Sequence, residues 1–250
     1  MLTVKGLVLS QKILGEQDKF IDILTAEYGV LEILVKGSGK INSKTGSATQ
    51  LFAYSEFCMN DVSKGIRILN SVKPIQIFYP LRKSVTAVAL ASYFSQIVLF
   101  SVLPKNGTPE ILRLFLNCLH YLSEQTMTET HLKAIFELRI ASLLGFMPDV
   151  VMCRNCGEYL PETIVFSVED GCFFCEHCVP PRKRNYILMP AGGLSAVRYV
   201  VLSDFEKIFS FRISERCEKP FCKFAEEFLS YHLDREFPTL SYYKAISRQH

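Results

Sequence analysis

Two pairs of cysteines have the residue type and the spacing of a metal site. Cys153 and Cys156 form one C-x-x-C pair and Cys175 and Cys178 form a second, with 18 residues between the inner cysteines. Each C-x-x-C turn presents two thiolates, and two such turns complete a tetrahedron of sulfurs around zinc at about 2.3 Å. Gly157, directly after the second cysteine, permits a tight turn there. The spacing therefore predicts a four-thiolate zinc site.

Four thiolates fill every position of a tetrahedral zinc ion. This favours a structural role, since a catalytic zinc keeps one position open. The sequence has neither H-E-x-x-H nor the H-x-E and P-C-x-x-C pattern of zinc deaminases. Cys172 forms a rival C-x-x-C pair with Cys175, and His177 is an alternative ligand. We expect Cys172 to be a small buried apolar residue, because it falls on a predicted strand and not in a turn.

The charge distribution separates the cysteine segment from the rest of the chain. Residues 153–181 contain one Lys/Arg and five Asp/Glu, whereas residues 182–250 contain twelve Lys/Arg and eight Asp/Glu. An acidic segment is a poor surface for a polyanion. We therefore expect the cysteines to be scaffolding, with any anion-binding surface elsewhere.

The overall composition is that of a globular protein, with 49% hydrophobic and 21% charged residues among 250. The first twelve residues lack the basic lead and the long apolar run of a signal peptide. We therefore expect a cytoplasmic protein, in a reducing compartment where clustered cysteines bind metal more often than they form disulfides.

A second candidate for ligand binding is the basic, glycine-rich stretch KGSGKINSKT at residues 36–45. The Walker phosphate-loop spacing fails, because residue 34 is leucine and isoleucine follows the second lysine. Lysines and backbone amides in such a loop can still contact a nucleic-acid backbone. A solvated hairpin loop is the alternative interpretation.

Two further features bear on nucleic-acid binding. Phe52, Tyr54 and Phe57 follow the basic loop and offer stacking surfaces for unpaired bases, although strand alternation favours the core for at least some of them. Arg182-Lys183-Arg184 follows a double proline. These three basic residues suit a phosphate contact or a solvated linker.

The N-terminal part of the chain has the pattern of short β-strands. Runs of branched and aromatic residues alternate with segments rich in Gly, Ser, Asn and Lys. Several short strands with one longer basic loop fit a small closed barrel such as an OB-fold. The predicted strands are at 2–10, 30–36, 52–59 and 66–72.

From residue 81 to residue 147 the apolar period becomes helical. Residues 85–103 carry no charge, and this stretch is just long enough for a membrane span. However, Ser92, Ser95 and Gln96 form a polar stripe at helical spacing. We expect a buried core helix here and no membrane span.

Other helix signals lie further along the chain. Thr108 and Pro109 indicate a helix start, and a helix over 129–144 ends at Gly145. Ser203 with Glu206 has the pattern of a capping box ahead of a further helix, and the last amphipathic helix is expected over 220–233.

Between the two cysteine pairs, TIVFSVEDGCFF at residues 163–174 predicts a β-hairpin that turns at Asp170-Gly171.

The order of these parts resembles the RecO family of bacterial DNA repair and recombination mediators. The resemblance covers nearly the whole chain, and its most specific part is the junction from the central helix to the first cysteine pair. The segments that carry it are LGEQDKFIDILTAEYG (14–29), KGSGKINSK (36–44), FELRIASLLGFMP with CRNCG (136–157), FSVEDGCFFCEHC (166–178) and FLSYHLDREFPTLSYYK (228–244).

The resemblance implies an α+β protein with an OB-fold domain at 1–80, a helical domain at 81–150 and 181–250, and a zinc-binding module at 151–180. It implies a non-enzymatic protein that binds single- and double-stranded DNA, anneals complementary strands and, with RecR, helps to load recombinase. It also implies binding to the acidic, apolar C-terminal tail of single-strand-binding protein, in the cytoplasm at the nucleoid. The expected DNA contacts are Lys36, Gly37, Lys40, Lys44, Arg67, Arg182, Lys183 and Arg184.

This chain departs from the family pattern in the basic loop, where Ser38 and Gly39 stand in place of arginines. We therefore expect weaker DNA binding through the loop and a larger contribution from the basic C-terminal part. In the family a Gly-Gly turn precedes the third cysteine, and here Cys172 occupies the second glycine's place.

Two rival functions come from other classes. A zinc-ribbon adaptor would bind proteins alone, without direct DNA contact. A zinc enzyme acting on nucleic acid would need an open metal position, which four thiolates do not provide.

Overall fold

The computed structural model describes residues 1–16, 18–37, 44–61, 67–103, 107–181 and 185–248. The chain forms two compact units. The barrel unit comprises Met1–Thr126 and Phe237–His250, and the cysteine unit comprises Met127–Glu236. The predicted α+β class is confirmed. The three-domain division made from the sequence groups the residues differently and stays a prediction.

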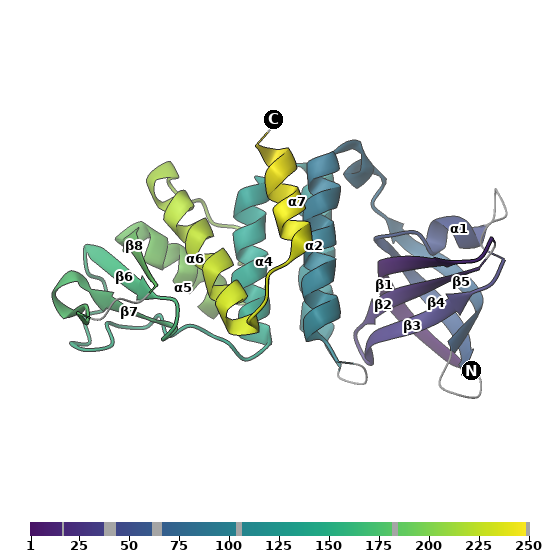
Figure 1. Cartoon of the computed structure of the whole chain (residues 1–250), viewed down its shortest axis with the longest axis horizontal. Helices are drawn as coiled ribbons and strands as arrows, with labels where there is room; N and C mark the ends of the chain where they lie inside the picture. Colours follow the sequence, from purple (N-terminus) through teal and green to yellow (C-terminus); the bar gives the residue numbers. More distant parts are fainter. Residues whose placement is uncertain (17, 38–43, 62–66, 104–106, 182–184, 249–250) are drawn as a thin grey trace. The chain divides into compact units, whose positions relative to one another are not determined.

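Five strands close into a barrel in the order β1-β2-β3-β5-β4 (Figure 1). A short helix, α1 (Lys44–Ala48), lies between β3 and β4 in the chain. The barrel closes where β3 and β5 run parallel, with Ile33 opposite Arg67, and all its other pairings are antiparallel. This is the Greek-key barrel of the OB type that the sequence predicted. The strands are β1 (Leu2–Leu14), β2 (Asp18–Thr25), β3 (Gly29–Val35), β4 (Ala53–Asp61) and β5 (Arg67–Ile77).

Period-two alternation fills the barrel. Every second residue of a strand points inward, and most of these positions carry branched or aromatic side chains. The buried cluster contains Val4, Val8, Ile21, Ile23, Leu31, Ile33, Val35, Ala53, Phe57 and Met59. β2 was not among the strands predicted from sequence, and β1 runs four residues further than predicted, to Leu14.

The charge-free stretch forms a core helix of the barrel unit, α2 (Val85–Ser101), as predicted. The hydroxyl of Ser84 caps it by accepting from the N–H of Ala87. Gln96 accepts hydrogen bonds from both the N–H and the hydroxyl of Thr239, which ties α2 to the last helix. The remaining elements of this unit are the 3₁₀ turn η1 (Tyr79–Lys83), α3 (Pro109–Glu124) and α7 (Pro238–Ser247). No helix within the described residues is both long and apolar enough to span a membrane.

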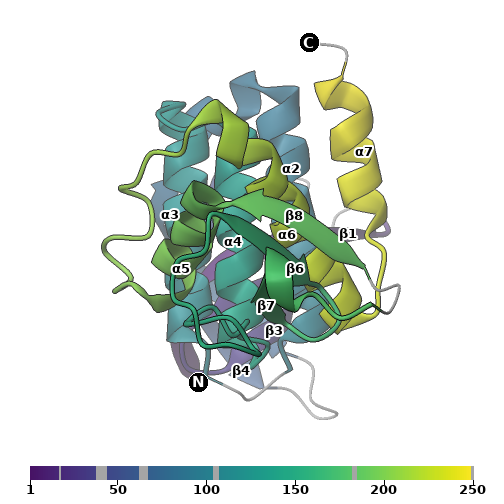
Figure 2. The same cartoon turned by 90° about the vertical axis from the view of Figure 1, so that its left-hand side faces the viewer.

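In the cysteine unit, helices lie against a sheet of three strands in the order β7-β6-β8 (Figure 2). β6 (Thr163–Ser167) and β7 (Cys172–Cys175) form the predicted hairpin, and β8 (Tyr186–Pro190) pairs with the other edge of β6. Phe166 of β6 stacks on Phe224 with ring centroids 4.2 Å apart, which joins the sheet to a helix. The other elements are α4 (Glu129–Leu143), η2 (Glu176–Cys178), α5 (Ala191–Leu202) and α6 (Glu215–Leu233).

The helix predicted from about Pro220 to Leu233 is confirmed as α6 and ends at Leu233, but it begins five residues earlier, at Glu215, with Pro220 inside it. A second helix prediction in this unit was wrong. Ser203 does not open a helix with Glu206. Its N–H already bonds to the carbonyl of Tyr199 and so ends α5. The residues after Ser203 form successive turns.

A buried ion-pair network joins α4 to α6. Lys133 Nζ lies 2.8 Å from Glu137 Oε1 and 2.8 Å from Glu226 Oε2, and the Glu137 side chain is fully buried. Burial disfavours the charged ammonium, but the two carboxylates outweigh this and raise the pKa of Lys133. The lysine therefore stays charged inside the unit.

We expect Lys133→Met to destabilise the protein by about 3–5 kcal/mol, because it leaves the Glu137 carboxylate buried without its lysine. The midpoint of urea unfolding measures the loss. The double variant Lys133→Met with Glu137→Leu should recover most of it, since a well-packed apolar pair replaces the ions. Equal losses in the single and double variants would contradict this explanation.

Candidate metal centre and nucleic-acid surface

The structure brings four thiols together. The sulfurs of Cys153, Cys156, Cys175 and Cys178 all lie within 4.8 Å of one another, and those of Cys156 and Cys175 are 3.7 Å apart. Four sulfurs at about 2.3 Å from a tetrahedral zinc ion would be about 3.8 Å apart. The cluster therefore has the size and the donor set of a tetrathiolate metal site.

Backbone hydrogen bonds hold the two cysteine turns in register. The N–H of Gly157 donates to the carbonyl of Cys153, and the N–H of Cys175 donates to the sulfur of Cys153 at 3.3 Å. The Asn155 amide donates to the carbonyl of Cys178 at 3.0 Å, which links the first turn to the second. Gly157 and Gly171, predicted to lie at turns, have φ angles of 77° and 60°, and Gly145, predicted to end a helix, has a φ angle of 96°.

The electrostatics of the cluster call for a cation. Burial would raise the pKa of Cys153, but backbone N–H groups of Cys156, Cys175 and Asn155 stabilise its thiolate and lower its pKa to about 6. Hydrogen bonds with the thiols of Cys175 and Cys156 raise the pKa of Cys178 to about 12. Four adjacent thiolates repel one another, so full ionisation needs a positive ion among them.

The ligand turn is fastened to α5 by Arg198, which the sequence analysis missed. Its Nε donates to the carbonyl of Val150 at 2.6 Å, and its Nη2 donates to the carbonyls of Val151 and Tyr159. The guanidinium also lies 4.0 Å from the centroid of the Tyr159 ring. One buried cation thus holds both ends of the loop that carries the first two cysteines. The only sequence signal was a lone arginine among apolar residues of AVRYVVL.

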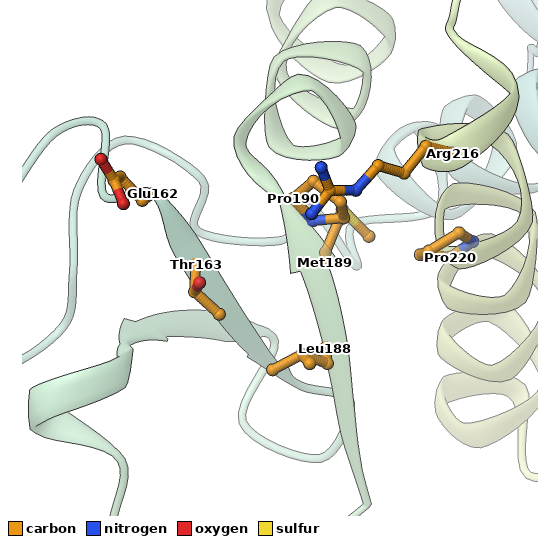
Figure 3. A pocket seen from close by; sticks show the side chains of 7 residues that line it. All are labelled: Glu162, Thr163, Leu188, Met189, Pro190, Arg216 and Pro220. Atoms are coloured by element: carbon orange, nitrogen blue, oxygen red, sulfur yellow. The ribbon is translucent and has the colours of Figure 1, made fainter.

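Two surface pockets of about 290 Å³ lie in the cysteine unit. One spans the first residues of β6, the exposed side of β8 and the start of α6, and Glu162 and Arg216 stand on separate sides of β8 (Figure 3). The other, beside the cysteine turns, is lined by Arg154, Asn155, Asp170, Cys172, Phe174 and Pro180. Cys172 itself is buried, as predicted.

Only part of the predicted DNA contacts lie in the described residues. Lys36 is exposed directly after β3, and the N–H of Gly37 donates to Asp18 Oδ1 at 2.9 Å. Arg67 is the first residue of β5 and pairs with Ile33 of β3, the strand that Lys36 follows. Lys44 opens α1, although its side chain is not described. The predicted contacts outside the described residues are Lys40, Arg182, Lys183 and Arg184.

Two of the three aromatic residues considered for base stacking belong to the core. Phe52 is buried and packs near Phe115, with ring centroids 6.4 Å apart, and Phe57 is buried inside the barrel. Tyr54 is half-buried. The alternative that strand alternation buries these residues is confirmed for Phe57. Phe52 is also buried, but it precedes β4, which begins at Ala53, and its ring packs near Phe115.

Comparison with known proteins gives a consistent match over both units. The family model described as "Recombination protein O N terminal" matches residues 1–78, and that described as "Recombination protein O C terminal" matches residues 82–241. A relative from Acetivibrio thermocellus, named "DNA repair protein RecO", is 28% identical over 247 residues, covering 99% of this chain and 98% of its own length. A relative of the same name from Alkaliphilus metalliredigens is 25% identical over 248 residues, covering 98% and 100%.

We expect Arg198→Lys to destabilise the cysteine unit by about 2–4 kcal/mol. A lysine cannot satisfy three carbonyls that diverge around a planar guanidinium, and some are left unpaired. Limited proteolysis should then cut within residues 150–160, and the thermal midpoint should fall.

The matched control is Arg212→Lys, which changes an exposed arginine of the same unit. If both variants have the wild-type midpoint and cleavage pattern, Arg198 does not hold the loop.

Proposed function

Because the chain belongs to the recombination protein O (RecO) family, we propose that it is a non-enzymatic DNA-binding mediator of recombinational repair that anneals complementary single strands. The observation that carries this proposal is the match of both family models, which together extend over nearly the whole chain. The closed barrel of the OB type is consistent with it, because such barrels bind single strands. A role in DNA repair follows from the family itself.

Annealing requires chemistry that the barrel unit can supply without a nucleophile. Lysines neutralise the phosphates so that two strands approach, and the bases must stay accessible. We propose Lys36, Gly37 and Arg67 as backbone contacts, together with Lys40, Lys44 and Arg182-Lys183-Arg184.

The partners proposed beyond DNA follow from the family alone. They are RecR, with which the protein would help to load recombinase, and the acidic C-terminal tail of single-strand-binding protein. The proposed location is the cytoplasm, at the nucleoid.

We propose that the four-cysteine cluster holds a structural zinc ion. The sulfur spacing and the four-thiol donor set fit this ion, and zinc would cross-link the turn at Cys153 to the turn at Cys175. The surrounding residues do the rest of the positioning, since Arg198 and Asn155 fix the first turn in place.

A second candidate function is a protein adaptor without direct DNA contact. The observation that favours it is a group of exposed apolar side chains on the rigid loop that Arg198 holds, namely Val151, Met152, Tyr159 and Leu160. Exposed apolar groups in an acidic surround suit a protein partner better than DNA. Fluorescence polarisation with labelled DNA, and with a labelled acidic tail peptide, separates the two candidates.

We expect single-stranded DNA affinity to fall steeply with salt, because bound lysines release counterions. Polarisation titrations of the full chain over a salt series measure the slope. Lys36→Gln should weaken binding and lower the log–log slope by about 0.7, the value for one phosphate contact on a single strand. Lys207→Gln, in which the lost lysine pairs with Asp204, serves as the control. Absence of any binding at low salt would rule out the proposed function.

We expect Cys153→Ser to lose zinc and to destabilise the cysteine unit, because metal-binding free energy is folding free energy here. Cys172→Ser is the matched control, since Cys172 is buried yet outside the sulfur cluster. Elemental analysis of the purified proteins should find one zinc per chain in the control and none in Cys153→Ser. A stable wild-type protein without zinc would contradict the structural site.

A further inference from the structure

The hairpin of β1 and β2 ends in two exposed apolar side chains. Ile13 is 83% exposed and Leu14 is 48% exposed. Ile13 stands opposite Lys19, and Leu14 stands opposite Asp18. Successive side chains of a strand point to opposite faces, so Ile13 and Leu14 emerge on opposite sides of the hairpin. The tip is therefore apolar on both of its faces.

The tip has one open edge, along β1, since β3 pairs with β2 as far as Lys19, the residue opposite Ile13. β4 pairs with β1 only as far as Leu7, so within the described residues the stretch 10–14 pairs with β2 alone. The register of β1 against β2 shifts between Val8 and Ser10. Such a bulge bends a strand and re-aims the residues beyond it.

The exposed tip stands on a fixed base. The side-chain amide of Gln11 and the ammonium of Lys19 both donate to the carbonyl of Thr49, at 2.5 Å and 3.0 Å. From the other side, the Asp18 carboxylate accepts the N–H of Gly37. Ile13 and Leu14 are thus presented by an anchored hairpin, and the hydrogen bond to Gly37 places the start of the basic loop beside it.

The face of the barrel that OB-folds ordinarily use is acidic at its centre. OB-folds bind strands across β2 and β3 and with the β1–β2 loop. Here Asp22 of β2 stands directly opposite Glu32 of β3, on the side away from the core residues Ile21 and Ile33. Two adjacent carboxylates repel phosphates. A strand on this barrel therefore gains more at the hairpin end, where Lys12 and Lys36 are exposed.

We propose that Ile13 and Leu14 form an apolar wedge that inserts between unpaired bases of a bound single strand, while Lys12 and Lys36 contact the flanking phosphates. Apolar wedges of this kind separate base steps in several DNA-binding proteins. This inference rests on the proposed function, since it presupposes single-strand binding. In this arrangement Ile13 and Leu14 contact bases, and Lys12 and Lys36 contact phosphates.

The charges at the tip are only weakly positive. Lys12, Lys19 and Lys36 exceed Glu16 and Asp18 by one charge, so phosphate attraction is modest there and base contacts must add to it. The two opposed apolar faces match the two base faces that appear when neighbouring bases unstack. A pocket on a protein partner would instead receive one face and leave the other exposed.

The test uses the full-length protein and a single-stranded oligonucleotide that carries 2-aminopurine, whose fluorescence rises when it unstacks. Wild-type protein should raise the emission on binding. Ile13→Ser with Leu14→Ser should lose most of that rise and on the order of tenfold in affinity. The salt slope should stay at the wild-type value, because no lysine is removed.

A second variant, Lys12→Gln with Lys36→Gln, should show the reverse pattern. Its log–log salt slope should fall by about 1.4, and the emission rise at saturation should persist. Ile75→Ser is the control for loss of an exposed apolar group, since Ile75 lies on β5, a strand that pairs with neither β1 nor β2.

Three outcomes decide the matter. A wedge variant with wild-type affinity and full emission rise overturns the wedge while leaving the proposed function intact. Wild-type protein that binds no oligonucleotide at low salt overturns the proposed function, and the wedge with it. If the double serine variant unfolds by circular dichroism, Ile13→Thr keeps a β-branched strand residue and removes the more exposed of the two apolar side chains, and unchanged affinity and emission in that variant overturn the wedge.

Discussion

The cysteine unit depends on how it compensates buried positive charge. A cation removed from water costs several kcal/mol unless carboxylates or carbonyls surround it. Lys133 meets this cost with two carboxylates, one on α4 and one on α6. Arg139 donates to the last carbonyls of α5, and Arg198 donates to the loop that carries the first cysteine pair. Each cation requires acceptors at fixed places, so α6, the end of α5 and the metal loop each have a fixed position against a helix.

The barrel unit faces a different electrostatic constraint. The inner face of the barrel is mainly apolar. The charged residues of its outer surface determine where a polyanion can lie. Asp22 and Glu32 make the centre of the β2–β3 face unfavourable for an anion, while Lys12, Lys19 and Lys36 lie where β1 and β3 end and β2 begins. An anion is therefore less disfavoured at this end of the barrel than at the centre of the β2–β3 face. This distinction depends on single residues and not on the barrel itself.

Most of the features that were predicted correctly from the sequence depend on short local patterns. The cysteine spacing, the turn at Asp170-Gly171 and the cap at Gly145 are each encoded within a few neighbouring residues. Arg198 could not be found in this way, because the carbonyls that it binds lie 39 to 48 residues earlier in the chain. The start of α6 was hidden by Pro220, which ordinarily marks a first turn. The strand β2 was not predicted because charged residues interrupt its apolar ones and the segment before it is polar.

The course of the chain has a consequence for the order in which the protein can mature on the ribosome. The barrel unit is built from both ends of the sequence, and its α2 is tied to α7 through Gln96 and Thr239. The cysteine unit is one continuous stretch between those ends. During synthesis, all residues of the cysteine unit are added to the chain before those of α7. The apolar side of α2 against which α7 packs must therefore wait until the whole cysteine unit has been translated, so the unit that is begun first is completed after the unit inserted into it.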